Sequence, residues 1–119
     1  MPSDRRQHDR YRFWIPIEVV VGDQRLPAVG HDMSRRGAAL VCRRPVAVET
    51  EVELSFQLPP GEGEVRRVRA VVRRAGPNAA DPSGLWPMEI GVEFEDEVPG
   101  LEDELQRLLS RLSGRNPAR

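Results

Sequence analysis

The chain has 119 residues, a length that suits one domain, and its 18 basic and 19 acidic residues leave a net charge of −1. All basic residues are arginine, and they concentrate in residues 1–74, which carry a net charge of +4, whereas residues 75–119 carry −5. A pI of about 6.1 argues against a dedicated nucleic-acid-binding domain. No apolar run is long enough for a transmembrane helix or resembles a secretion signal, so we expect a cytoplasmic domain without membrane insertion.

The first predicted segment, residues 1–12, is rich in arginine and has no apolar periodicity. Arg5, Arg6, Arg10 and Arg12 fall within eight residues. Guanidinium groups this close repel one another unless an anion lies between them. We interpret the segment as a flexible arginine arm, and two roles stay open on these residues alone: a solvated basic tail or a contact to an anionic ligand.

Six short strands are predicted by alternating apolar and polar residues, because successive side chains of a strand point to opposite faces. The strands are expected at residues 11–21, 25–29, 38–43, 50–58, 65–74 and 88–94. Pro16 interrupts the first of them, which suggests an edge or a bulge at that point. Turns rich in Gly and Pro separate the strands, and an antiparallel barrel is favoured over a sandwich because closure leaves fewer exposed edges.

The connection from Gly30 to Gly37 (GHDMSRRG) lies between two predicted strands. Side-chain oxygens of Asp32 and Ser34 suit an Asx or ST turn, in which they accept hydrogen bonds from nearby backbone N–H groups. Gly37 can adopt a positive φ. The pattern therefore indicates either a well-built turn or a loop whose donors and acceptors face a ligand.

The end of the chain changes period and predicts a helix over residues 99–113. Its apolar stripe consists of Leu101, Leu105, Leu108, Leu109 and Leu112. Acidic residues open the helix and arginines follow later, as the helix dipole favours. We expect the stripe to pack on the barrel, with a dimer or partner contact as the alternative, and residues 114–119 to be disordered.

Two motifs considered together resemble the PilZ domain family. Arg6-x-x-x-Arg10 precedes the first strand, and Asp32-x-Ser34-x-x-Gly37 follows about 20 residues later. The segments 68–73 and 90–94 are similar to late strands of that family, so the resemblance covers roughly residues 5–95. It implies an all-β fold: a six-stranded antiparallel PilZ-type β-barrel over residues 11–95, followed by a C-terminal α-helix.

The resemblance also implies a function, because PilZ domains are bacterial receptors for the second messenger cyclic di-GMP. Arg6 and Arg10 match the two arginines of the motif and would bind guanine and phosphate, and Arg5 is a further candidate contact. Arginine suits this ligand because its planar fork pairs with guanine O6 and N7, stacks on bases and binds phosphate oxygens.

The second motif would complete the ligand site. Asp32 and Ser34 match the positions that hydrogen-bond a guanine edge, and Gly37 matches the motif glycine, which needs no side chain. Arg36 is a departure, because relatives commonly carry a small residue there. Its long side chain could add an ionic contact to the ligand or obstruct the loop.

Other chemistry-bearing residues form no recognisable site. Cys42 cannot form an internal disulfide and is expected to be an inert thiol near the core. His8 and His31 lack neighbours with metal-ligand spacing, so we expect no metal site. No catalytic triad is evident, and we expect that the protein has no cofactor and is not an enzyme. Trp14 and Trp86 are interpreted as packing residues of the core or of the barrel end rather than as platforms for bases.

The leading hypothesis is therefore a cyclic di-GMP effector that controls a protein partner in motility, exopolysaccharide secretion or a similar process. The alternative is a PilZ-like protein–protein adaptor that does not bind nucleotide. A single-stranded nucleic-acid-binding barrel is a third hypothesis, disfavoured because aromatic residues make up only 5% of the chain. Homodimer formation stays open.

Overall fold

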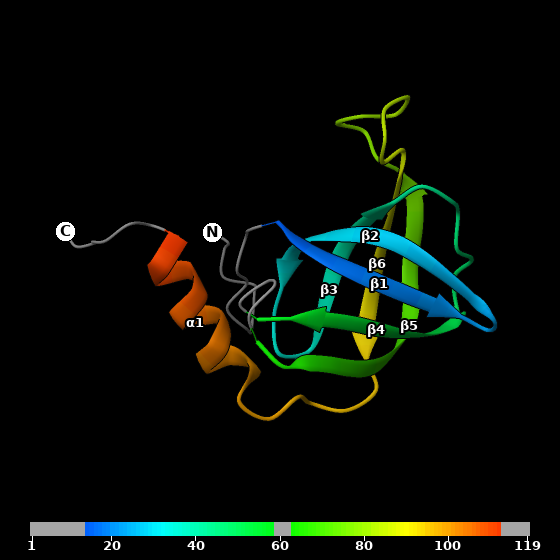
Figure 1. Cartoon of the computed structure of the whole chain (residues 1–119). Coiled ribbons are helices and arrows are strands. Elements are labelled where there is room, and N and C mark those ends of the chain that lie inside the picture. Colours follow the sequence, from blue (N-terminus) through cyan, green and yellow to red (C-terminus); the bar gives the residue numbers. More distant parts are fainter. Residues whose placement is uncertain (1–13, 59–62, 113–119) are drawn as a thin grey trace, which may run out of the picture.

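The computed structural model describes residues 14–58 and 63–112. Its strands form one closed antiparallel barrel in the order β1-β2-β3-β6-β5-β4, with a helix at one end (Figure 1). The elements are β1 (Ile15–Val21), β2 (Gln24–Met33), β3 (Gly37–Cys42), β4 (Glu51–Gln57), β5 (Val65–Pro77), β6 (Met88–Phe94) and α1 (Leu101–Leu112). The expected fold, a six-stranded antiparallel β-barrel with a C-terminal α-helix, is confirmed.

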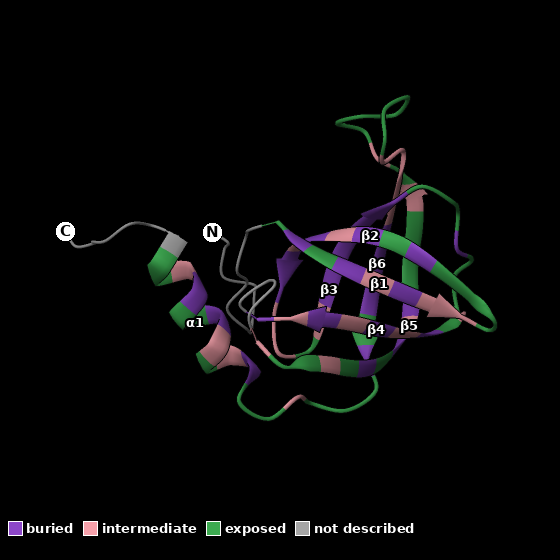
Figure 2. Cartoon of the chain, in the orientation of Figure 1, coloured by how far each residue is buried: buried purple, intermediate pink, exposed green. Residues whose placement is uncertain are grey.

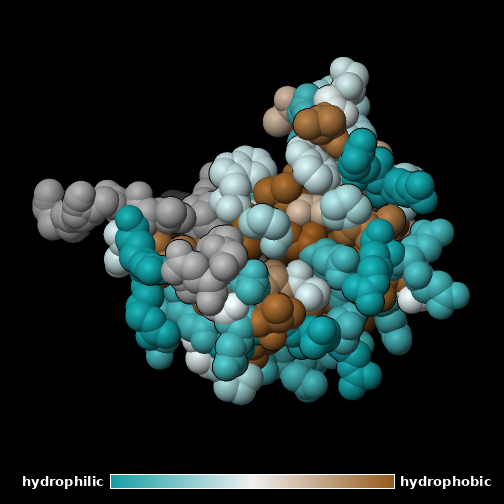
Figure 3. Space-filling view, in the orientation of Figure 1, coloured by the Kyte–Doolittle hydropathy of each residue, from teal (hydrophilic) through white to brown (hydrophobic). Residues whose placement is uncertain are grey.

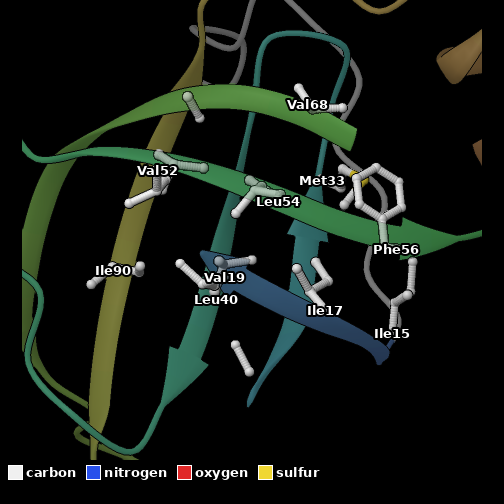
Figure 4. Close-up of a cluster of buried hydrophobic side chains, with 14 of the residues drawn as sticks. Ile15, Ile17, Val19, Met33, Leu40, Val52, Leu54, Phe56, Val68 and Ile90 are labelled. Carbon is white, nitrogen blue, oxygen red and sulfur yellow. The ribbon is translucent and has the colours of Figure 1, made fainter. Parts of the chain in front are cut away.

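The barrel interior is filled by the apolar half of each alternating strand. In β4 the buried positions are Val52, Leu54 and Phe56, which alternate with more exposed residues (Figure 2). Side chains from opposite walls meet in the interior, where Leu40, Leu54 and Ile90 are completely buried (Figure 4). Burial of this apolar surface is the main favourable contribution to folding.

The seam between β1 and β4 is the shortest ladder of the barrel, because only residues 18–20 of β1 pair with β4. Pro16 lies outside this ladder and has a partner on one side only, Val29 of β2. A residue without an N–H group is tolerated at such a local edge, so the expected edge at Pro16 is confirmed. On the face of the barrel seen in Figure 1, hydrophobic residues appear at the surface among hydrophilic ones (Figure 3).

Helix α1 is joined to the barrel by apolar packing. Leu101, Leu105 and Leu108 are buried and belong to the same hydrophobic cluster as the interior strand residues, which confirms that the stripe packs on the barrel. Gly100, with a φ of 76°, precedes the helix, and its carbonyl accepts the N–H of Glu104. Within the described residues, no helix is long and apolar enough to cross a membrane.

Strand β2 is longer than predicted. It continues through His31 and Asp32 to Met33, so the segment from Gly30 to Gly37 is not a loop throughout, and only residues 34–36 connect β2 to β3. The prediction missed this extension because β2 contains a β-bulge, which interrupts the alternation on which the strand assignment relied.

Candidate ligand site

A β-bulge in β2 determines where the Asp32 side chain points. Gly30 pairs with Leu40 and the next pair is Asp32 with Ala39, so His31 is the extra residue. Met33 then pairs with Ala38, and both belong to the interior cluster, whereas Ala39 does not. The bulge therefore turns Met33 into the core and Asp32 onto the outer wall of the barrel.

This outward placement keeps the carboxylate out of the apolar interior of the barrel. Without the bulge, Asp32 would share the face of Gly30, whose added Cβ would lie 2.6 Å from the Ile17 Cδ1 atom in the interior. A carboxylate there would lose its hydration without compensation. On the outer wall Asp32 is still only 8% exposed, which makes it the one buried charged residue in the described part of the chain.

The turn after Asp32 is built around Ser34. The backbone N–H of Ser34 donates to the carbonyl of Gly37 at 2.9 Å, and Ser34 Oγ accepts the N–H of Arg36 at 3.2 Å. The predicted ST turn is thus present at Ser34. Its hydroxyl proton is not used in this contact, so Ser34 can still donate a hydrogen bond.

Gly37 is required for a different reason from the one predicted. It does not have a positive φ; among described glycines only Gly22 and Gly100 do. A Cβ at Gly37 would instead collide with the carbonyl oxygen of Val92 in β6. The glycine is needed because two backbones approach closely at the start of β3.

Small residues form the outer wall beside Asp32. Asp32 pairs with Ala39, Ala39 with Gly91 of β6, and Gly91 with Arg74 of β5. Gly91 faces outward between the inward-facing Ile90 and Val92, and a Cβ on it would lie 2.9 Å from Arg74 Nη2. The Arg74 guanidinium group therefore lies against the outer wall, in the same row of residues as Asp32. The signal in the sequence was a glycine on the polar face of a strand, which marks close approach.

The predicted arginines are only partly placed. Arg5, Arg6 and Arg10 lie outside the described residues, as does the whole predicted arm of residues 1–12. Arg36 is half exposed, and its Nη1 atom lies 3.8 Å from Glu97 Oε2. Of the predicted site residues, the structure thus places Asp32, Ser34 and Gly37, which lie together where β2 ends and β3 begins.

Two other polar groups are already engaged in structural contacts. Arg73 donates from Nε to Glu93 at 2.9 Å and from Nη1 to Glu49 at 3.0 Å, and these hydrogen bonds raise the pKa of the guanidinium group. Cys42 is 1% exposed, and burial raises the pKa of its thiol. The interpretation of Cys42 as an inert thiol is consistent with this burial.

Trp14 was interpreted as a packing residue of the core or of the barrel end, and the core alternative is wrong. Trp14 is 68% exposed, and its ring lies over His31 with the ring centroids 5.6 Å apart. His31 Nε2 in turn lies 3.0 Å from Glu89 Oε2 of β6. Sequence reasoning missed this group because its members are far apart in the chain and no local pattern connects them. Within the described residues, no three potential metal ligands gather.

Comparison with known proteins identifies relatives of this fold. A family model described as "PilZ domain" matches residues 4–111. No match was found among curated proteins.

Solved structures with the same fold include the Bacillus subtilis inhibitor of motility MotI/DgrA, with a TM-score of 0.70 and 21% identity over 94% of this chain. The match covers 54% of that protein, so the chain spans about half of its length. The PilZ domain of Escherichia coli YcgR, solved with c-di-GMP, matches with a TM-score of 0.69 and 15% identity over 92% of both chains. The PilZ domain of CeSA from a cellulose-synthesizing bacterium has a TM-score of 0.58 and 24% identity, over 88% of this chain and 98% of its own.

Proposed function

The chain belongs to the PilZ domain family, and we propose that it is a non-catalytic receptor for cyclic di-GMP. The observation that carries this proposal is the Asp32 carboxylate, which is buried and yet faces the outer wall beside the Ser34 turn. A carboxylate that is excluded from the core and shielded from water suits hydrogen bonds to a ligand. The PilZ domain of YcgR, solved with c-di-GMP, supports the choice of ligand.

Each motif residue has a chemical role in the proposal. Asp32 accepts hydrogen bonds from the N1–H and N2–H groups of a guanine, and Ser34 donates its hydroxyl proton to the ligand. Arg6 and Arg10 bind guanine O6 and N7 or the phosphate oxygens, and Arg5 adds a further cationic contact.

Binding would act on a partner by joining two parts of the chain. When one ligand contacts both the arginine arm and the barrel wall, the arm is held against the barrel and the surface presented to a protein changes. The names of the relatives, a motility inhibitor and a PilZ domain of CeSA, support control of motility or of polysaccharide synthesis.

Isothermal titration calorimetry with cyclic di-GMP tests the proposal. We expect the wild-type chain to bind, and Arg10→Ala and Asp32→Asn each to weaken binding by about tenfold or more, since hydrogen bonds to charged groups contribute roughly 1.5–3 kcal/mol. Arg25→Ala is the matched control, because Arg25 lies at the other end of β2, roughly 20 Å from Asp32 by strand geometry, and pairs with Glu18 at 2.9 Å.

Two results would contradict this proposal. Absence of binding by the wild-type chain would favour the nucleotide-independent adaptor, which predicts a protein partner that is indifferent to cyclic di-GMP. Wild-type affinity in both variants would reject the residue assignment even if the ligand bound.

A further inference from the structure

A cavity of about 380 Å³ lies on the outer wall of the barrel. Residues from four separate segments line it, among them Trp14, His31, Val41, Trp86 and Glu89. Its volume falls within the range of about 300–1,000 Å³ that is usual for small-molecule pockets. Among the motif residues that the structure describes, Asp32, Ser34 and Gly37 do not belong to its lining.

The cavity has aromatic walls suited to a planar ligand. Trp14 exposes 68% of its surface, and one of its neighbours is the His31 ring, tilted by 40°. Trp86, from the connection between β5 and β6, lines the same cavity. These are the two tryptophans of the chain. Exposed aromatic rings that gather at a cavity provide stacking surfaces for nucleobases.

The polar edge of the cavity carries a carboxylate, that of Glu89, which can discriminate between nucleobases. The Oε2 atom of Glu89 lies 3.0 Å from His31 Nε2, and this contact orients the carboxylate. The other oxygen of Glu89, Oε1, makes no hydrogen bond or ion pair within the described part of the chain. An oriented carboxylate can accept two adjacent N–H donors. Guanine presents N1–H and N2–H side by side, whereas adenine presents an acceptor at N1, so the carboxylate favours guanine.

The cavity lies within reach of the Asp32 motif. The bulge at His31 places His31 and Asp32 next to each other at the outer wall, and Ala39 pairs with both Asp32 and Gly91, two residues beyond Glu89. Two strand spacings across and two residues along correspond to about 12 Å between Asp32 and Glu89. A dinucleotide with two guanines can therefore contact both places.

We propose that Trp14 and Glu89 form a second guanine subsite, in which Trp14 stacks on the base and Glu89 accepts hydrogen bonds from its N1–H and N2–H groups. The inference rests on the proposed function and extends it, because the ligand is then held by one guanine near Asp32 and by the other in the Trp14 cavity. It also gives Glu89, together with Asp32, a part in the preference for guanine over adenine.

The stacking role is tested by calorimetry on the full chain with cyclic di-GMP. We expect Trp14→Ala to weaken binding by about five- to a hundredfold, the range for loss of one base–aromatic stack, and Trp14→Phe to retain most of the affinity. Leu85→Ala is the matched control, because Leu85 is also 68% exposed but does not line the cavity. Thermal unfolding of each variant verifies that it is folded.

The base-selective role is tested by comparing cyclic di-GMP with cyclic di-AMP. Glu89→Gln should reduce the preference for cyclic di-GMP by about tenfold, because an amide has only one acceptor oxygen and its NH₂ group opposes the guanine donors. Glu18→Gln is the control, since Glu18 is likewise ion-paired but lies outside the cavity lining.

A fluorescence measurement reports the stacking directly. In Trp86→Phe, Trp14 is the single tryptophan, and its emission should be quenched as cyclic di-GMP binds. If the wild-type chain does not bind cyclic di-GMP, the proposed function fails and the subsite fails with it. If the wild-type chain binds, but Trp14→Ala matches Leu85→Ala in affinity and Trp14 emission does not change, the subsite is rejected and the proposed function stands.

Discussion

At Gly37 the backbone of β3 lies so close to β6 that no side chain fits. A Cβ would collide with the carbonyl oxygen of Val92. Next to this contact, the Phe94 N–H of β6 donates a hydrogen bond to the carbonyl of Arg36 at 2.8 Å. Arg36 belongs to the turn that Ser34 stabilises. The glycine therefore supports the position of the Ser34 turn through its contact with β6.

We expect Gly37→Ala to lower the free energy of unfolding by about 1–3 kcal/mol, because the backbones must separate to admit the methyl group. Urea denaturation measures this change. Gly76→Ala is the control, since a Cβ at Gly76 would have no heavy atom within 4 Å and its φ is not positive. Similar destabilisation of both variants would show that close approach to Val92 is not the reason for the glycine.

Between elements, an ion pair fixes the helix to the sheet. Arg66 of β5 donates from Nε to Glu104 Oε1 at 3.0 Å and from Nη2 to the other carboxylate oxygen, forming a bidentate pair. The two side chains are 28% and 24% exposed. Partial burial and bidentate geometry make such a pair stronger than an ordinary surface pair.

A double-mutant cycle with Arg66→Met and Glu104→Gln should give a coupling free energy of about 1 kcal/mol in thermal or urea unfolding. The comparison pair is Arg25–Glu18, whose side chains are 72% and 41% exposed and which should couple by roughly 0–0.5 kcal/mol. Equal coupling in the two cycles would mean that the pair to α1 contributes no more than a surface contact.

The whole molecule shares one hydrophobic cluster. Strand residues from all six strands and three leucines of α1 belong to it, and closure of the barrel leaves each strand with a partner on both sides. We therefore expect the barrel and the helix to unfold as one cooperative unit.

Leu105→Ala tests this cooperativity. Leu105 is completely buried, so the substitution should lower the free energy of unfolding by about 2–5 kcal/mol. The loss should appear as faster amide hydrogen exchange in β3 and β6 as well as in α1. Ser110→Ala, at an exposed position of the same helix, should leave exchange unchanged. Faster exchange confined to α1 would indicate that the helix unfolds separately from the barrel.

Local patterns predicted much of this fold and part of the candidate site. The alternation of β6 gave its bounds, residues 88–94, and the leucine stripe predicted a C-terminal helix that packs on the barrel. Such patterns are readable because one buried face imposes a period of two or of 3.6 on neighbouring residues. The motif of Asp32, Ser34 and Gly37 was identified through its resemblance to the PilZ pattern, and its roles stay proposals.

What could not be read from spacing depends on contacts between distant residues. The reason for Gly37 is the position of Val92, and the exposure of Trp14 and its contact with His31 depend on how the barrel closes. The bulge at His31 is equally hidden, because it arises from the registers of β2 against β3 and not from the residues of β2 considered separately.

The amino-acid order was thus sufficient to predict an arginine-rich front, six amphipathic strands, an amphipathic helix and membership of the PilZ domain family. Only the tertiary structure decided that Asp32 faces the outer wall and that Trp14, Trp86 and Glu89 line one cavity beside it. The physical reason is that amphipathic periodicity is recorded within a few consecutive residues. The orientation of a bulged side chain and the walls of a cavity exist only after strands far apart in the chain have paired.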